Sequence, residues 1–314
     1  MAENSKIEWT THTFNPWWGC TKVSDGCKFC YADSLATGRF GLKVWGPTAD
    51  RKPASEATWK EPLKWNKSAE KAGERHRVFC ASMADVFEGP DTCQNPEAYK
   101  VIEDARVRLF NTIIETPHLD WLLLTKRPEN IIPALQQIPV LKRDNLWDSL
   151  WADGAWKRNF PNVWLGTSVE SQKTAEERIP YLLEIPAEVR FLSCEPLLGP
   201  VALDTYYREE GDSCAPCYSV WLDYIHWVIV GGESGPNARP MHPDWARDLR
   251  DQCQRHETPF HFKQWGEYVS VSEVEGVGPH FTFPDGATVR RIGKKAAGRT
   301  LDGRTWDELP EASQ

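Results

Sequence analysis

Three cysteines stand close together near the start of the chain, and their type and spacing indicate chemistry most clearly. The stretch WWGCTKVSDGCKFCYA contains Cys20, Cys27 and Cys30, separated by six and by two residues. Closely spaced thiols bind zinc, bind an iron–sulfur cluster, or act as redox groups or nucleophiles. Because a nucleophile needs only one cysteine and a basic neighbour, the group of three favours a metal centre.

The number of thiols separates two kinds of metal centre. Structural zinc takes four protein ligands, so the three cysteines would need His12, or the distant pair Cys214 and Cys217, to complete a set. A [4Fe–4S] cluster held by three thiolates instead leaves one iron open for another ligand. The spacing by itself leaves zinc, an iron–sulfur cluster, or neither as alternatives.

A second group of chemically active residues follows the short apolar runs of the chain. Six of these runs end in polar or charged residues, in the segments SMAD (82–85), TKR (125–127), SVE (168–170), SCE (193–195), GGE (231–233) and KQW (263–265). Because the carboxyl ends of parallel strands meet at one face of a βα fold, we expect a functional mouth there. Carboxylates facing a Lys–Arg pair suit a ligand that carries both charges, such as an amino acid derivative.

The elements that position these residues alternate between strands and helices. The apolar runs are continuous, as in parallel strands covered on both faces. They lie at 77–83, 119–125, 162–169, 189–194, 226–232 and 259–263, and THTFN (11–15) is a further strand before the cysteine loop. Helices are expected at about 28–40, 95–116, 128–138, 171–184 and 244–256. The sequence therefore predicts an α/β fold made of βα repeats.

Two segments interrupt this alternation, and the end of the chain has a different character. Residues 140–161 and 204–222 are interpreted as insertions, and PDGA (284–287) as a hairpin turn. We expect a βα barrel over 1–265 and a C-terminal extension with a basic segment over 266–314.

The composition limits the classes of protein. The 314 residues carry a net charge of −8, which argues against a globally basic nucleic-acid binder but not against a local basic patch. No run reaches the roughly 18 apolar residues of a membrane span, and the N-terminal residues lack the apolar core of a signal peptide. We therefore expect a soluble, cytoplasmic protein without a membrane partner. Of its nine cysteines, the clustered ones are expected to serve as metal ligands or redox groups rather than as disulfides, and Cys80 and Cys253 as buried small apolar residues.

The cysteine loop resembles that of radical S-adenosylmethionine (SAM) enzymes. Those enzymes have C-x3-C-x2-C after the first strand of a barrel, with an aromatic residue before the last cysteine. Phe29 matches the aromatic residue, whereas the first gap here is six residues. SMADVFEGP, LLLTKRP, VWLGTSVES and VRFLSCEPLLGP then resemble, in order, segments of radical SAM proteins related to spore photoproduct lyase. Over nearly its whole length the chain resembles a phage- and prophage-associated family of uncharacterised radical-SAM-like proteins, the "gp thirty-seven / gp sixty-eight" type.

The resemblance implies a fold, two cofactors and a set of residue roles. The fold would be a partial (β/α)6-type barrel of the radical SAM kind. Cys20, Cys27 and Cys30 would hold a [4Fe–4S] cluster whose open iron chelates SAM, and one electron from a donor would cleave SAM to a 5′-deoxyadenosyl radical. The residues implied for SAM binding are Ser82, Asp85, Lys126, Ser168, Glu170 and Glu195. Those implied for substrate binding are Arg127, Glu233, Arg239, Lys263 and Gln264.

The substrate and the catalytic residues are not identified by the sequence. Residues 286–305 carry six basic side chains against the single acid Asp302, as in a solvated tail or in an arm that contacts phosphates. With the resemblance, this segment favours modification or repair of a nucleic acid or nucleotide. The alternative is a non-catalytic, zinc-stabilised phage protein that binds nucleic acid or protein. A third hypothesis is a barrel enzyme whose cysteines are structural.

Overall fold

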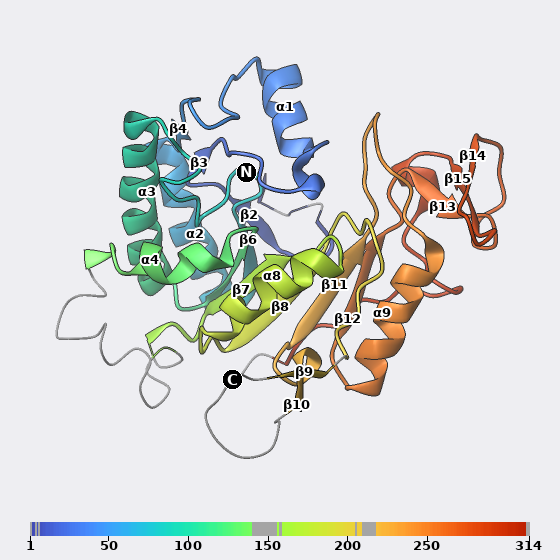
Figure 1. Cartoon of the computed structure of the whole chain (residues 1–314). Helices are drawn as coiled ribbons and strands as arrows, with labels where there is room; N and C mark the ends of the chain where they lie inside the picture. Colours follow the sequence, from blue (N-terminus) through green and yellow to red (C-terminus); the bar gives the residue numbers. More distant parts are fainter. Residues whose placement is uncertain are drawn as a thin grey trace. The chain divides into compact units, whose positions relative to one another are not determined.

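The computed structural model describes residues 2–3, 5, 7–139, 156, 159–204, 206–208 and 218–311. The chain divides into two compact units. Unit 1 comprises residues 1–167 and 181–188, and unit 2 comprises residues 168–180 and 189–314. Both units combine parallel strands with helices, which confirms the predicted α/β class (Figure 1).

Unit 1 is built on parallel strands in the order β2, β5, β6 and β7, with the short β1 antiparallel to β2. The strands are Ala2–Glu3 (β1), His12–Phe14 (β2), His76–Cys80 (β5), Leu119–Thr125 (β6) and Val163–Ser168 (β7). β6 and β7 are buried along almost their whole length, as expected for continuous apolar runs. A separate ribbon of β3 (Trp17–Trp18) and β4 (Lys52–Pro53) leads into the cysteine loop.

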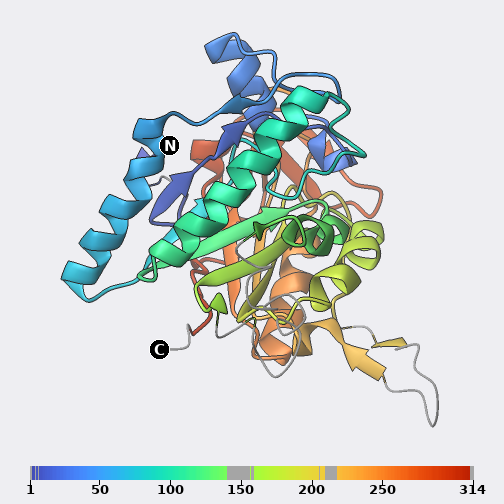
Figure 2. The same cartoon turned by 90° about the vertical axis from the view of Figure 1, so that its left-hand side faces the viewer.

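The helices of unit 1 include one that was not expected from the sequence. Its helices are Tyr31–Phe40 (α1), Glu56–Ala72 (α2), Pro96–Glu115 (α3) and Ile131–Leu135 (α4). α2 and α3 lie side by side, and α2 packs against β5 and β6 (Figure 2). α2 forms despite Pro62 in its interior because Ser55 caps its first turn and because Trp59, Pro62 and Trp65 share a buried face.

Unit 2 contains the parallel strands β8 (Val189–Cys194), β11 (Trp227–Gly231) and β12 (Phe260–Gln264), in that order. Its longer helices are α9 (Pro243–Arg255), which packs against β11 and β12, and most of α8 (Gln172–Leu183), whose last three residues are counted with unit 1. α9 begins at the Pro–Asp pair as predicted, and the His242 imidazole caps it by accepting the N–H of Asp244.

The C-terminal part of unit 2 forms a small antiparallel sheet. Its strands are Tyr268–Ser270 (β13), His280–Thr282 (β14) and Thr288–Arg291 (β15), and the short helix α10 (Lys294–Ala297) follows. The predicted PDGA turn joins β14 and β15, with Gly286 at a φ of 94°. A further hairpin pairs β9 (Tyr206–Arg208) with β10 (Tyr218–Val220).

The predicted strands agree closely with the structure. All six apolar runs are strands, and THTFN contains β2. The insertions predicted at 140–161 and 204–222 fall largely outside the described residues, and Cys214 and Cys217 fall wholly outside them. The division at residue 265 stays a prediction. Within the described part of the chain, no helix is both long and apolar enough to cross a membrane.

Candidate functional site

The cysteine loop belongs to unit 1 and lies between β3 and α1. Cys27 ends a 3-10 turn, and Cys30 immediately precedes α1. Gly19, just before Cys20, has a φ of +121°, and a Cβ atom there would lie 2.4 Å from the carbonyl oxygen of Val44. Only glycine allows the chain to pass this close, so the entry to the loop is fixed by backbone packing. All three cysteines are free thiols.

Cys27 has a hydrogen-bonding partner within the loop, and Cys30 has partners in α1. The Cys27 sulfur lies 3.7 Å from the Ser24 hydroxyl. Burial raises the pKa of the Cys30 thiol, while hydrogen bonds from the backbone N–H groups of Asp33 and Ala32 act in the opposite direction. These two N–H groups belong to the first turn of α1, whose unpaired donors favour negative charge.

Cys20 is held from outside the loop by Arg127. The Nη1 and Nη2 atoms of Arg127 lie 3.7 and 3.8 Å from the Cys20 sulfur. Nη1 also donates to the Asp85 carboxylate at 2.7 Å, and Nη2 donates to the carbonyl oxygen of Thr21. Arg127 is only 2% exposed, and its buried Nε has no hydrogen-bond partner among the described residues.

A second buried ion pair lies beside this contact. Arg51 donates to both oxygens of Glu88, at 2.9 and 2.7 Å, and both side chains are fully buried. Arg106, also buried, donates to the carbonyl oxygens of Val86 and Glu88 at 2.9 and 2.8 Å. The sequence reasoning missed Arg51, Glu88 and Arg106, because nothing in their spacing connects residues so far apart in the chain.

The buried arginines of this region are held in two ways. Arg127 pairs with Asp85 and Arg51 with Glu88, whereas Arg106 is held by backbone carbonyl oxygens. We call Arg51, Arg106, Arg127, Asp85 and Glu88 the arginine cluster. Of its members, Arg127 donates to the Cys20 sulfur, so a buried and paired guanidinium lies against one thiol of the loop.

The electrostatics of Cys20 and Arg127 are coupled. Burial by itself would lower the pKa of Arg127, but Asp85, Cys20 and Glu88 outweigh it and raise that pKa. Burial raises the pKa of the Cys20 thiol, against the attraction of Arg127. Binding of a metal ion at Cys20 would therefore have to displace the thiol proton, with Arg127 favouring the resulting thiolate.

The residues of unit 1 predicted to bind SAM lie close to this cluster. The Ser82 hydroxyl exchanges hydrogen bonds with the Asn15 amide at 3.1 and 3.3 Å. The Asp85 carboxylate already accepts four hydrogen bonds, from the N–H groups of Phe87 and Lys126, the Thr125 hydroxyl and Arg127. A ligand amino group at Asp85 would have to replace one of them. The SAM-binding roles of Ser82, Asp85 and Lys126 stay predictions.

In unit 2, each predicted strand-end carboxylate has a cation of its own. The pairs are Glu170 with Arg178 (2.8 Å), Glu195 with Lys263 (2.5 Å) and Glu233 with Arg239 (2.7 Å). Arg178 also donates to the carbonyl oxygen of Ser168, and the Gln264 amide donates to that of Gly232. The structure therefore accounts for these residues as ion pairs and hydrogen bonds within unit 2, and their ligand-binding roles stay predictions.

Glu195 differs from the other two carboxylates. Its Oε1 is buried and has no hydrogen-bond partner among the described residues, while Oε2 binds Lys263. A Cβ atom on Gly231 would lie 3.3 Å from the Glu195 carboxyl carbon, so a glycine at this strand end leaves room for the side chain.

The three thiols do not form a ready-made metal site. Among the described residues, no group of three or more His, Cys, Asp or Glu side chains is arranged to hold a metal ion. His12, a possible fourth ligand, instead stacks on Trp65 at 4.3 Å and lies 3.1 Å from a ring nitrogen of His76. The three thiols of the cysteine loop, with their hydrogen-bonding partners, are suitable ligands for an iron–sulfur cluster. Binding of such a cluster would require the three sulfur atoms to move closer together.

The remaining described cysteines that the sequence left unassigned are buried. Cys80 and Cys253 lie in the core, and burial raises the pKa of both thiols, as expected of small apolar residues. Cys194, at the end of β8, is fully buried as well.

Most arginines of the basic segment are engaged within unit 2. Arg290 donates to the carbonyl oxygen of Gly276, Arg291 to that of Pro236, and Arg299 to Asp307. Arg304 lies 3.6 Å from the centre of the Trp306 ring. These contacts make the segment part of the fold of unit 2 and do not test the predicted nucleic-acid substrate.

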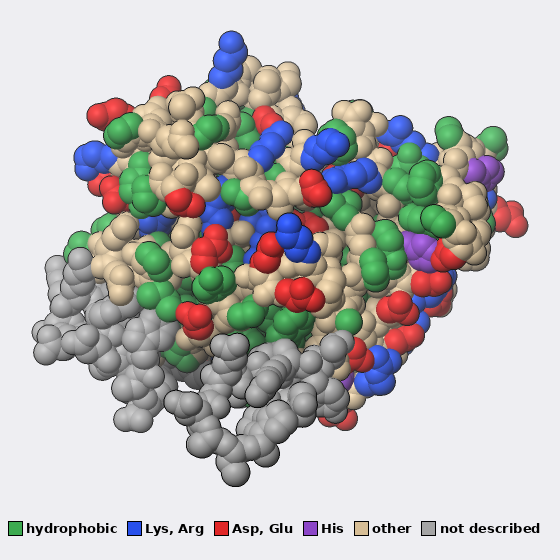
Figure 3. Space-filling model, viewed as in Figure 1, with side chains coloured by type: hydrophobic (Ala, Val, Ile, Leu, Met, Phe, Trp, Pro, Cys, Tyr) green, Lys and Arg blue, Asp and Glu red, His purple; other side chains and the backbone are tan. Residues whose placement is uncertain are grey.

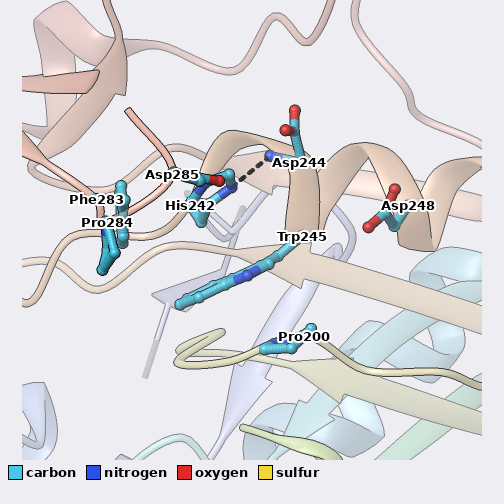
Figure 4. Close-up of a pocket in the computed structure, with 8 residues that line it drawn as sticks. All are labelled: Pro200, His242, Asp244, Trp245, Asp248, Phe283, Pro284 and Asp285. Atoms are coloured by element: carbon cyan, nitrogen blue, oxygen red, sulfur yellow. Dashed lines mark hydrogen bonds and ion pairs between the residues drawn. The ribbon is translucent and has the colours of Figure 1, made fainter. Parts of the chain in front are cut away.

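Unit 2 also carries an open groove of about 420 Å³ beside the start of α9, which none of the predicted site residues lines (Figure 4). Trp245, Phe283 and two prolines form its apolar part, and Asp244, Asp248 and Asp285 its acidic part. Acidic side chains gather on the molecular surface over α9 (Figure 3). Asp244 pairs with Arg247 and Asp285 with His242, so two of the three carboxylates of the groove have partners within unit 2.

Comparison with known proteins identifies a family. The family model described as "Protein of unknown function (DUF5131)" matches residues 4–310. A solved structure of a spore photoproduct lyase mutant aligns with 93% of this chain and 71% of its own, at 12% identity and a TM-score of 0.40. No curated protein matches the chain. The phage association implied by the sequence stays a prediction. Since the family model spans almost the whole sequence, the chain belongs to the family of proteins of unknown function described as DUF5131.

Proposed function

We propose that the chain is a radical SAM enzyme whose cysteine loop holds a [4Fe–4S] cluster through Cys20, Cys27 and Cys30. The observation that carries the proposal is a short loop with three free thiols, one of which accepts hydrogen bonds from the buried Arg127 guanidinium. A cluster bound by three thiolates carries net negative charge, which this guanidinium would stabilise. The chemistry of such a cofactor, when bound, is one-electron cleavage of SAM to methionine and a 5′-deoxyadenosyl radical.

The residues of the loop would hold the cluster in different ways. Arg127 would hydrogen-bond the Cys20 sulfur, and the Ser24 hydroxyl would lie beside Cys27. The first turn of α1 would direct N–H groups at Cys30. Hydrogen bonds to ligand sulfurs stabilise thiolates and tune the cluster. Structural zinc takes four protein ligands, and His12, the described candidate for the fourth, stacks on Trp65 beside His76, so we place zinc second.

The finer fold and the substrate belong to the same proposal. Parallel strands followed by helices are what a partial (β/α)6-type barrel of the radical SAM kind requires. Ser82 and Lys126 are the candidates in unit 1 for contacts with SAM. A nucleic acid or nucleotide is the proposed substrate class, on the strength of the sequence resemblance and the basic segment.

The test is anaerobic reconstitution with iron and sulfide, followed by SAM and a reductant. The proposal predicts 5′-deoxyadenosine above the level formed by a Cys20→Ala/Cys27→Ala/Cys30→Ala variant carried through the same steps. Cys253→Ala, which removes a thiol in the core of unit 2, should retain the activity. Equal product from the wild type and the triple variant, or one zinc per chain without sulfide, would contradict the proposal.

A further inference from the structure

The Arg127 guanidinium is placed as a donor to one particular cysteine. Its two terminal nitrogens lie at nearly equal distances, 3.7 and 3.8 Å, from the Cys20 sulfur. Both distances fall within the range of N–H···S hydrogen bonds, which are longer than those to oxygen. Cys30 has a different cation in its surroundings, since the charge of Lys126 acts to lower the pKa of that thiol.

The position of Arg127 is fixed from several directions. Its Nη1 binds Asp85 at 2.7 Å, and its backbone N–H donates to the Thr125 hydroxyl at 2.9 Å. The same hydroxyl donates to Asp85 at 2.7 Å, so residue 125 connects the carboxylate to the arginine. Nη2 reaches the carbonyl oxygen of Thr21, the residue after Cys20. Arg127 therefore holds both the side chain of Cys20 and the backbone beside it.

The contacts require a guanidinium rather than any cation. A lysine ammonium is a single point charge, whereas the planar fork of arginine reaches the carboxylate, the carbonyl oxygen and the sulfur at once. At 2% exposure, the fork is also shielded from water, so its charge acts strongly on the sulfur.

We propose that Arg127 is a positioning residue of the cysteine loop: it holds Cys20 and supplies N–H donors to the sulfur that Cys20 gives to iron. Its charge makes Cys20 the ligand that governs the reduction potential of the loop's cluster. This inference rests on the proposed function, and it changes the predicted role of Arg127 from substrate binding to support of the metal site. Hydrogen bonds to the sulfurs of an iron–sulfur cluster are among the main determinants of its reduction potential.

The first experiment uses the protein without an iron–sulfur cluster. The metal-free protein is alkylated with iodoacetate, an anion, and in parallel with neutral iodoacetamide, and modification of Cys20 is quantified by peptide mass spectrometry. The rate with iodoacetate is divided by the rate with iodoacetamide. The intrinsic reactivity of the thiol affects both rates equally, so their ratio reports the local charge. Arg127→Met should lower this ratio at Cys20 by about threefold or more, because a nearby buried cation attracts the anionic reagent. The ratio at Cys27 should remain unchanged.

Two controls separate this effect from loss of structure. Arg75→Met removes an arginine of unit 1 that pairs with the buried Asp120 and contacts no cysteine, so it should leave the Cys20 ratio unchanged. If Arg127→Met is unstable, Asp85→Asn/Arg127→Met takes its place. The double variant should fold, because removing both partners leaves no unpaired buried charge. A Cys20 ratio that is the same in the wild type and in both Arg127 variants would overturn the inference.

The second experiment measures the midpoint potential of the reconstituted cluster. Arg127→Met should shift the potential to more negative values, Arg127→Lys should shift it by less, and Arg75→Met should not shift it. Equal potentials in the wild type and Arg127→Met would overturn the inference while leaving the proposed function intact. A wild type that binds no cluster would instead contradict the proposed function, and the alkylation ratio would still decide whether Arg127 controls Cys20.

Discussion

Unit 1 and unit 2 both place charged residues where parallel strands end, but the cations have different partners. In unit 2, Glu170, Glu195 and Glu233 each meet one cation. In unit 1, Arg127 meets Asp85 and also the sulfur of Cys20. An ion pair is explained by the fold, whereas a buried cation that also donates to a thiol can support a metal ligand. The difference identifies the cysteine loop, rather than the charged strand ends in general, as the stronger candidate for chemistry.

The largest expected effect concerns the metal content of the cysteine loop. Cys20→Ala, Cys27→Ala or Cys30→Ala should each abolish most of the bound iron after reconstitution, since each thiol supplies a quarter of the coordination of one iron. The measurement is iron and acid-labile sulfide per chain, with Cys80→Ala as the buried control. Retention of full iron by any of the three variants would remove that cysteine from the ligand set.

A smaller effect, on stability, compares the charges of the two units directly. Glu88→Gln should lower the free energy of unfolding by about 3–5 kcal/mol, because it leaves the fully buried Arg51 without its carboxylate. Glu233→Gln should cost about 1–2 kcal/mol, since its partner Arg239 is 28% exposed and water can solvate it. Urea unfolding of both variants measures the two costs. Equal losses would mean that the deeper burial of the pair in unit 1 has no energetic consequence.

The pH dependence of stability tests a buried group of unit 1 outside the arginine cluster. Burial, and then His76, lower the pKa of His12 from 6.5 to about 4. The unfolded chain therefore binds a proton at His12 before the folded chain does, so the stabilisation is present above pH 6.5 and is lost as the pH falls toward 4. The loss should be about 3 kcal/mol.

His12→Phe separates this contribution from general acid unfolding. The variant keeps a ring against Trp65 and removes the titration. Its unfolding free energy should decline less than that of the wild type between pH 6.5 and 4. Parallel declines in the two proteins would show that another group titrates there.

The smallest expected effect concerns the ion pair of unit 2 that is least well satisfied. Glu195 has one buried oxygen without a partner among the described residues, so the pair with Lys263 gains little over apolar packing. Glu195→Gln/Lys263→Met should change the free energy of unfolding by no more than about 1 kcal/mol. A loss of several kcal/mol would place the pair among the essential parts of unit 2.

The sequence predicted the elements of the fold well because periodicity and apolar runs are local. Every expected strand is present, and α9 begins at the Pro–Asp pair. α2 was missed because Pro62 argues against a helix locally, whereas burial of Trp59 and Trp65 favours one in the folded unit. The local conformational preference of a segment is overridden where tertiary packing contributes the larger free energy.

The candidate site was predictable only in part. The spacing of Cys20, Cys27 and Cys30 and the strand-end position of Asp85 are visible in the sequence. The contacts of Arg51 with Glu88 and of Arg127 with Cys20 join residues 37 and 107 positions apart, which spacing cannot relate. Arg127 was assigned to substrate because a charged strand end resembles a binding residue until its partners are known.

The central claim is that the three-thiol loop binds a cluster with one iron open to SAM. Its most direct test is the electron paramagnetic resonance spectrum of the reduced, reconstituted protein with and without SAM. We predict a [4Fe–4S] signal whose g values change when SAM is added, because SAM ligates the open iron. A cluster signal that SAM leaves unchanged, or a protein that binds zinc and no sulfide, would contradict the claim.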